Sequence, residues 1–101
     1  MRWAAKTDAN QAEIVAALRA MGATVQPLHA VGKGCPDLLV GFRGVNHLIE
    51  VKDFRASAKD RRLRDTQEDW HAGWKGRVSV AETPEAAMAI VAGLAIKGEI
   101  R

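Results

Sequence analysis

The stretch PDLLVGFRGVNHLIEVK, residues 36–52, contains two strand-like segments separated by a glycine-containing turn. Residues 37–40 and 45–52 are rich in aliphatic and β-branched side chains, which favours strands on both sides of the turn. If Arg43 and Gly44 form a two-residue hairpin loop, the resulting register places Asp37 directly opposite Glu50. The sequence therefore predicts a β-hairpin with two carboxylates facing each other at its open end.

The predicted carboxylate pair needs a compensating positive charge. Side chains in directly opposed positions have Cβ atoms roughly 4.5–5.5 Å apart, where like charges repel. Lys52 follows Glu50 by two positions, so strand alternation puts it on the same face. Mg²⁺ or Mn²⁺ held by Asp37 and Glu50 would relieve the repulsion, polarise a phosphoryl group and lower the pKa of a bound water, with Lys52 stabilising charge. The alternatives are a turn-capping Asp37 and a solvated polar strand face, which Leu48 on that face argues against.

The same residues resemble a known nuclease signature. Pro36-Asp37, a gap of twelve residues and Glu50-Val51-Lys52 look like the PD-(D/E)xK motif. The segment LRDTQ at residues 63–67, followed by Trp70, is similar to the VRR-NUC group, small virus-type nucleases related to Holliday junction resolvases. The resemblance runs from about residue 10 to residue 85 and covers most of the chain.

This resemblance implies a fold, an activity and further site residues. The fold is a restriction-endonuclease-like α/β core, in which a central mixed sheet is flanked by helices. The activity is that of a metal-dependent endodeoxyribonuclease acting on branched DNA, a Holliday junction or a flap, in viral-type replication, recombination or repair. The Val51 carbonyl and Glu13 join Asp37 and Glu50 as expected metal ligands, although a solvent-facing Glu13 is an equal alternative. Gln67 is expected to contact the metal-bound water or the scissile phosphate, with a plain surface glutamine as the competing interpretation.

Basic residues are concentrated around the predicted site. The formal net charge is +3 and the sequence pI is about 9.4, a mild excess that is compatible with a polyanionic partner. Two basic residues flank the predicted carboxylate pair, and four more lie in the solvated loop that precedes the second helix. The expected phosphate contacts are Lys33, Arg55, Lys59, Arg61, Arg62 and Arg64. These positions predict a DNA-binding surface beside the carboxylate pair.

The chain reads as one domain covering residues 1–101, in the order α-β-β-β-α-β-α. The first helix is expected to be capped by Asp8 with Gln11, and the second by Asp65 with Glu68. A mobile loop is expected over residues 53–64, because no apolar periodicity is present there. Trp70 and Trp74, four positions apart, fit core packing better than base stacking. The last helix is expected to begin at Thr83-Pro84.

The remaining expectations concern location and partners. A single cysteine, Cys35, favours a reducing compartment, and without an apolar run of about 20 residues the chain is expected to be cytoplasmic, in a bacterial or phage-infected cell. No small-molecule cofactor and no membrane partner are expected. A homodimer is expected, through the last helix with Leu94, Ile96 and Ile100, or through the strand near Val25. The alternative function is a nucleic-acid binding module on the same fold that does not cleave.

Overall fold

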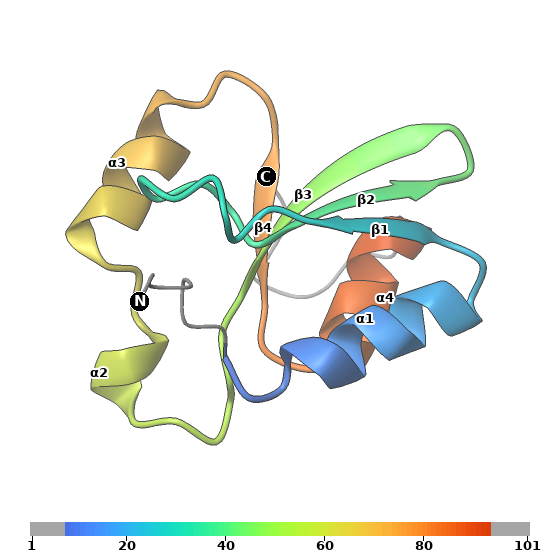
Figure 1. The fold of residues 1–101 in the computed structure, drawn as a ribbon, viewed down its shortest axis with the longest axis horizontal. Coiled ribbons are helices and arrows are strands. Elements are labelled where there is room, and N and C mark those ends of the chain that lie inside the picture. The colour runs from blue at the N-terminus through green and yellow to red at the C-terminus, as the bar shows by residue number, and fades with distance from the viewer. Residues whose placement is uncertain (1–7, 94–101) are drawn as a thin grey trace.

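The computed structural model describes residues 8–93 as an α/β fold with a four-stranded mixed sheet (Figure 1). The elements, in chain order, are α1 (Gln11–Ala20), β1 (Thr24–Pro27), β2 (Leu38–Phe42), β3 (Val45–Val51), α2 (Ala58–Arg61), α3 (Asp65–Gly73), β4 (Val78–Ala81) and α4 (Pro84–Ala92). The strand order is β1-β2-β3-β4, antiparallel except for the parallel pair β3 and β4. The predicted mixed sheet with flanking helices is confirmed at this level.

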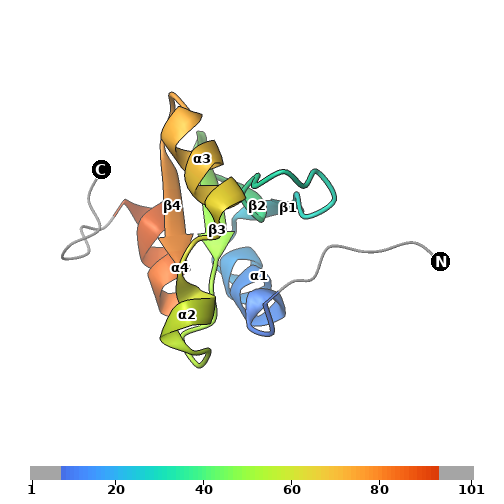
Figure 2. The same ribbon diagram turned by 90° about the vertical axis from the view of Figure 1, so that its left-hand side faces the viewer.

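The hydrophobic core lies between one face of the sheet and the helices α1 and α4. Alternation along the strands sends one set of side chains to this face, and the two helices supply the opposing set. The core residues are Ile14, Leu18, Ala23, Leu38, Val40, Ile49, Val51, Ala81, Ala87 and Val91. Figure 1 shows α1 and α4 side by side along the sheet, and Figure 2 shows α2 and α3 at the end of the sheet where β3 leaves it. The helices therefore serve different purposes: α1 and α4 cover the core, whereas α3 brings Gln67 to Glu50.

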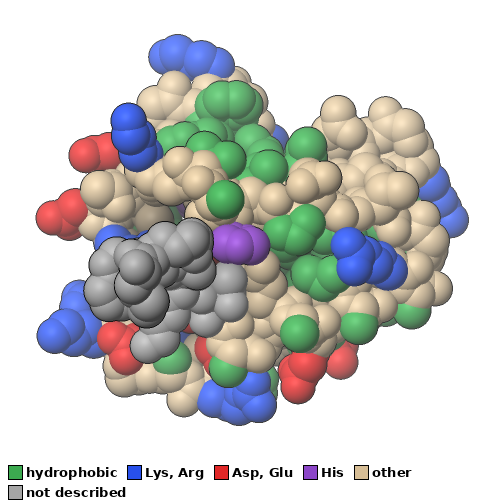
Figure 3. Space-filling model, viewed as in Figure 1, with side chains coloured by type: hydrophobic (Ala, Val, Ile, Leu, Met, Phe, Trp, Pro, Cys, Tyr) green, Lys and Arg blue, Asp and Glu red, His purple; other side chains and the backbone are tan. Residues whose placement is uncertain are grey.

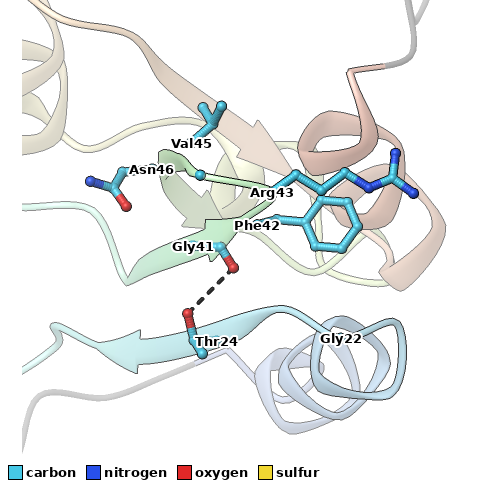
Figure 4. A pocket seen from close by; sticks show the side chains of 8 residues that line it. Gly22, Thr24, Gly41, Phe42, Arg43, Val45 and Asn46 are labelled. Atoms are coloured by element: carbon cyan, nitrogen blue, oxygen red, sulfur yellow. Dashed lines mark hydrogen bonds between the residues drawn. The ribbon is translucent and has the colours of Figure 1, made fainter.

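The hairpin between β2 and β3 has the predicted two-residue loop. Arg43 and Gly44 have φ angles of 51° and 80°, and positive values at both loop positions define the type I′ turn that matches strand twist. The ladder pairs Phe42 with Val45 and continues to Leu38 with Ile49. Figure 4 shows the turn end of this hairpin, where the Thr24 hydroxyl donates to the Gly41 carbonyl at 3.3 Å. The surface hollow lined by these residues lies at the opposite end of β3 from Glu50.

Several local predictions are wrong in detail. The segment expected to be a mobile loop contains the one-turn helix α2, which Ser57 caps by accepting a hydrogen bond from the Asp60 N–H at 3.2 Å. The first helix begins at Gln11 with Asn10 in the cap position, so Asp8 does not cap it. The observed order is thus α-β-β-β-α-α-β-α, one helix more than expected.

The last helix follows its predicted start signal. Thr83 accepts a hydrogen bond from the Ala86 N–H at 3.0 Å, and Pro84 occupies the first helical position. Gly93 ends α4 in the left-handed conformation with φ of 77°. Leu94, Ile96 and Ile100, which were expected to extend this apolar surface, lie outside the described residues. Within residues 8–93, no helix has the length and apolar character needed to cross a bilayer.

Candidate active site

The backbone of the hairpin brings Asp37 and Glu50 together. The last ladder pair is Leu38 with Ile49, so the next positions outward are Asp37 and Glu50, as the sequence predicted. Asp37 Oδ2 accepts a hydrogen bond from the Val51 N–H at 2.8 Å. This bond replaces the missing ladder contact and fixes the Asp37 carboxylate against the end of β3. The pair is therefore part of the rigid sheet.

Glu50, Lys52 and Gln67 form a buried polar network. Gln67 donates from Nε2 to Glu50 Oε2 at 2.7 Å, and its Oε1 accepts from Lys52 Nζ at 3.0 Å. The three residues are 1%, 5% and 5% exposed, respectively. Lys52 Nζ lies 3.8 Å from Glu50 Oε2, which is longer than either contact to Gln67. The Gln67 amide therefore bridges the two side chains. The structure thus brings all four predicted catalytic residues to one place.

Burial keeps the Glu50 carboxyl in its protonated form at neutral pH. Its removal from water, together with the nearby charge of Asp37, raises its pKa from 4.5 to about 8, although Lys52 acts in the opposite direction. The contact between Lys52 and Glu50 is therefore not a fully charged ion pair near pH 7. Raised pKa values of this kind, caused by burial and a like charge, are common at functional sites.

The pair fits a hard divalent cation that retains several waters. Glu50 Oε1 is buried and has no hydrogen-bond partner among residues 8–93, so it is available as a ligand next to Asp37. No group of three or more His, Cys, Asp or Glu side chains suited to a metal occurs in the described part of the chain. Two carboxylates, a main-chain carbonyl such as that of Val51, and water molecules are the set that Mg²⁺ accepts.

Two acids of the N-terminal region, Glu13 and Asp8, differ in their relation to this network. Glu13, an expected ligand, is exposed on α1, and no group of three or more acids, histidines or cysteines suited to a metal includes it among residues 8–93. Its charge acts on Arg55, whose pKa is raised mainly by the hydrogen bond to Asp53 and only slightly by Glu13. The structure does not bring it to Asp37 and Glu50. The pKa of Asp8, by contrast, is affected by residues of the site: burial raises it, the charge of Lys52 lowers it and the charge of Asp37 raises it. Its proximity was missed because Asp8 was interpreted as a helix cap.

Asn10 holds together the backbone behind the site, and sequence reasoning missed it. Its side chain is fully buried, and Nδ2 donates to the Lys52 carbonyl at 3.0 Å and to the Glu82 carbonyl at 2.8 Å. These carbonyls directly follow β3 and β4, so one amide connects α1 to the ends of both strands. Asparagine before a helix is the usual capping signal, and nothing in the local sequence separates that use from this one.

Gly34 lets the loop before Asp37 pack against α3. Its φ is +84°, and a Cβ at this position would overlap the Thr66 carbonyl. Thr66 precedes Gln67, so the contact positions the first turn of α3 beside the carboxylates. The same turn is closed by Gln67 Oε1, which accepts from the Arg64 N–H at 2.9 Å. The cap is thus Arg64 with Gln67, not the predicted Asp65 with Glu68.

Cys35 and His71 border the site without a place in its network. Burial and the charges of Glu50 and Asp37 raise the pKa of the Cys35 thiol, which keeps it protonated and argues against a nucleophile. Burial and the charge of Lys52 lower the pKa of His71, so its imidazole is neutral at pH 7. His71 Nε2 is buried and has no partner within residues 8–93.

The six predicted phosphate-binding residues divide into two groups. Arg55 and Arg61 already have carboxylate partners: Arg55 contacts Asp53 at 3.0 Å and Arg61 contacts Glu82 at 3.6 Å. Lys33, Lys59, Arg62 and Arg64 are exposed on the loop before Asp37 and on the segment from α2 to the start of α3. They are the better candidates for phosphate contacts. Comparisons with family models, with curated proteins and with solved structures give no match for this chain.

Proposed function

We propose that the protein is a metal-dependent endonuclease that hydrolyses phosphodiester bonds in DNA, with a core of the PD-(D/E)xK type and the VRR-NUC arrangement. The observation that carries the proposal is the buried Glu50 carboxyl beside Asp37, with one oxygen lacking a partner. Burial next to Asp37 destabilises the charged form of the Glu50 carboxyl. A purely structural role gives no reason to place a carboxyl there. A cation that binds both acids would supply that reason.

Each residue of the network has a role in the proposed reaction. A bound Mg²⁺ or Mn²⁺ would polarise the phosphoryl group and lower the pKa of its water. Asp37 and Glu50 would hold that ion, with the Val51 carbonyl as a further ligand. Lys52 carries the positive charge that stabilises the developing negative charge on the phosphate. Gln67 keeps Lys52 Nζ pointing at the acids, because its amide accepts from the ammonium and donates to Glu50.

The proposed substrate is branched DNA, cut by a twofold homodimer. A symmetric junction needs two cuts on opposing strands, and a dimer supplies two sites related by the same symmetry. The edge strand β1 is a candidate contact, because a strand at the edge of a sheet leaves one row of backbone groups available for pairing. Light scattering with and without junction DNA tests the dimer, and a monomer under both conditions would remove it.

The decisive experiment is a cleavage assay on single-stranded, duplex, flap and four-way junction DNA, with Mg²⁺, with Mn²⁺ and with EDTA. We expect metal-dependent cleavage that is lost in Asp37→Asn and Lys52→Ala. Glu13→Gln removes an exposed acid and should retain cleavage, which makes it the matched control. Binding without cleavage by the wild-type protein in both metals would favour the non-cleaving binding module instead.

A further inference from the structure

Helix α3 and the residue that caps its C-terminus carry two tryptophans outside the hydrophobic core. The indole rings of Trp70 and Trp74 are stacked, with centroids 4.6 Å apart and an interplanar angle of 16°. Core packing was the expectation for this pair, but neither ring belongs to the core cluster or to the side chains packed against it in residues 8–93. Trp74 is 46% exposed. A large flat surface is therefore presented to solvent by the helix that also bears Gln67.

Trp70 covers only one face of the Trp74 ring. One face stacks on Trp70, and the edge bearing Nε1 is close to Gly76, where an added Cβ would lie 2.9 Å from that nitrogen. Trp74 is nearly half exposed and Trp70 covers only one ring face, so the exposed area lies on the second face and the remaining edges. Figure 3 shows hydrophobic side chains gathered on the surface between α3 and the strands. An open aromatic face of this kind accepts another flat ring in offset stacking.

The position of the pair relates it to the acids. Gln67 and Trp70 are three residues apart on one face of α3. Trp74 is the residue directly after the helix, and its backbone N–H donates to the Trp70 carbonyl at 3.1 Å, which continues the same face by one position. The seven positions from Gln67 to Trp74 span about 10 Å along the axis. That length corresponds to about three nucleotides at roughly 3.4 Å each along a stacked strand. The acids of α3 lie on other faces: Asp65, Glu68 and Asp69 are all exposed.

From this arrangement we infer that the Trp70–Trp74 pair is a stacking platform for an unpaired base of the substrate strand, a few nucleotides from the phosphate at Asp37 and Glu50. A base inside a duplex is already stacked on both sides, so only an unpaired base can use the open ring face. The substrate class is then DNA that is single-stranded on the side of Trp74, as in a flap. The location of the cut relative to the stacked base rests on the proposed nuclease function.

The test measures binding in EDTA, so that no result depends on cleavage. The background protein is Trp3→Phe, which leaves Trp70 and Trp74 as the only tryptophans. The probes are a labelled oligothymidylate and the duplex it forms with oligoadenylate. In Trp74→Ala we expect roughly 5- to 150-fold weaker binding of the single strand and a change under about twofold for the duplex. Val45→Ala removes another exposed hydrophobic side chain, 54% exposed, and should change neither affinity.

The outcomes of these measurements distinguish the possibilities. Quenching of tryptophan fluorescence by oligothymidylate in the Trp3→Phe background, together with single-strand affinity that is lost in Trp74→Ala and kept in Trp74→Phe, would support stacking. Equal losses for single strand and duplex, or no loss, would overturn it. Dissociation of a wild-type dimer by Trp74→Ala would also overturn it, because the ring would then serve self-association. Single-strand stacking without any metal-dependent cleavage would reject the nuclease and keep the platform.

Discussion

Replacing Glu50 by Gln in the absence of metal should make the fold more stable above neutral pH. The pKa of Glu50 is raised from 4.5 to about 8, so the folded state binds a proton that the unfolded state has released. A group of this kind stabilises the fold fully below about pH 4.5, and that contribution is lost as pH rises towards 8. Each pH unit in this range costs up to about 1.4 kcal/mol.

The clean window for this measurement is pH 6.5 to 8.5. Burial lowers the pKa of His47 and His71, so below about pH 6.5 protonation of the unfolded state destabilises the fold and opposes the effect of Glu50. Above about pH 7.5 both histidines are neutral in both states, and between pH 6.5 and 7.5 their remaining contribution is the same in every variant and cancels in the comparison. The Glu50 effect then amounts to about 2 kcal/mol up to pH 8, a fall in Tm of about 8–16 °C for a domain of this size.

The assay is thermal unfolding in EDTA, followed by circular dichroism, for the wild type, Glu50→Gln and the charge-matched control Glu13→Gln. We expect the wild type and Glu13→Gln to lose stability in parallel across the window, while Glu50→Gln stays nearly flat. Saturating Mg²⁺ should flatten the wild-type curve as well, because the ion favours the carboxylate. If Glu50→Gln and the wild type fell together, the raised pKa of Glu50 would be refuted.

Three further changes test other parts of the site. Arg62→Ala should weaken duplex DNA binding and reduce the slope of log affinity against log salt by about 0.9, whereas Arg43→Ala, at the far end of the hairpin, should leave the slope unchanged. Gly34→Ala should destabilise the fold in urea by about 1–3 kcal/mol more than Gly32→Ala, because both have positive φ but only the first clashes with α3. Gln67→Ala should cost about 1–3 kcal/mol in the same melts and reduce cleavage, since Glu50 and Lys52 lose their shared partner.

The hairpin was predictable because its information is local. Two strand-like segments and a loop ending in glycine determine the register, and the register alone places Asp37 opposite Glu50. The same holds for Thr83 and Pro84 at the start of α4, where cap and first-turn signals lie within three residues. For these parts of the fold and the site, spacing in the sequence was sufficient.

Other features depend on contacts between distant residues and were not predictable. Asn10 looks like an ordinary cap but donates to the carbonyls of residues 42 and 72 positions away. Gly34 looks like any loop glycine in the sequence. Only the folded chain shows that a side chain there would collide with the Thr66 carbonyl. Helix α2 was missed because a single exposed turn buries no apolar face, so no periodicity marks it.

The twelve residues between the two carboxylates consist of five pairs that face each other across the hairpin and a turn of two residues. Removing both members of one facing pair, such as Phe42 with Val45, would shorten the hairpin and still leave the carboxylates opposed. Removing one residue from β3 would turn Glu50 towards the hydrophobic core and Ile49 towards the site, and removing one from β2 would turn Asp37 towards the core instead. What matters for the site is therefore that the number of residues between the two carboxylates stays even, more than what that number is. A single deletion should disrupt the site, whereas deletion of a facing pair should preserve it.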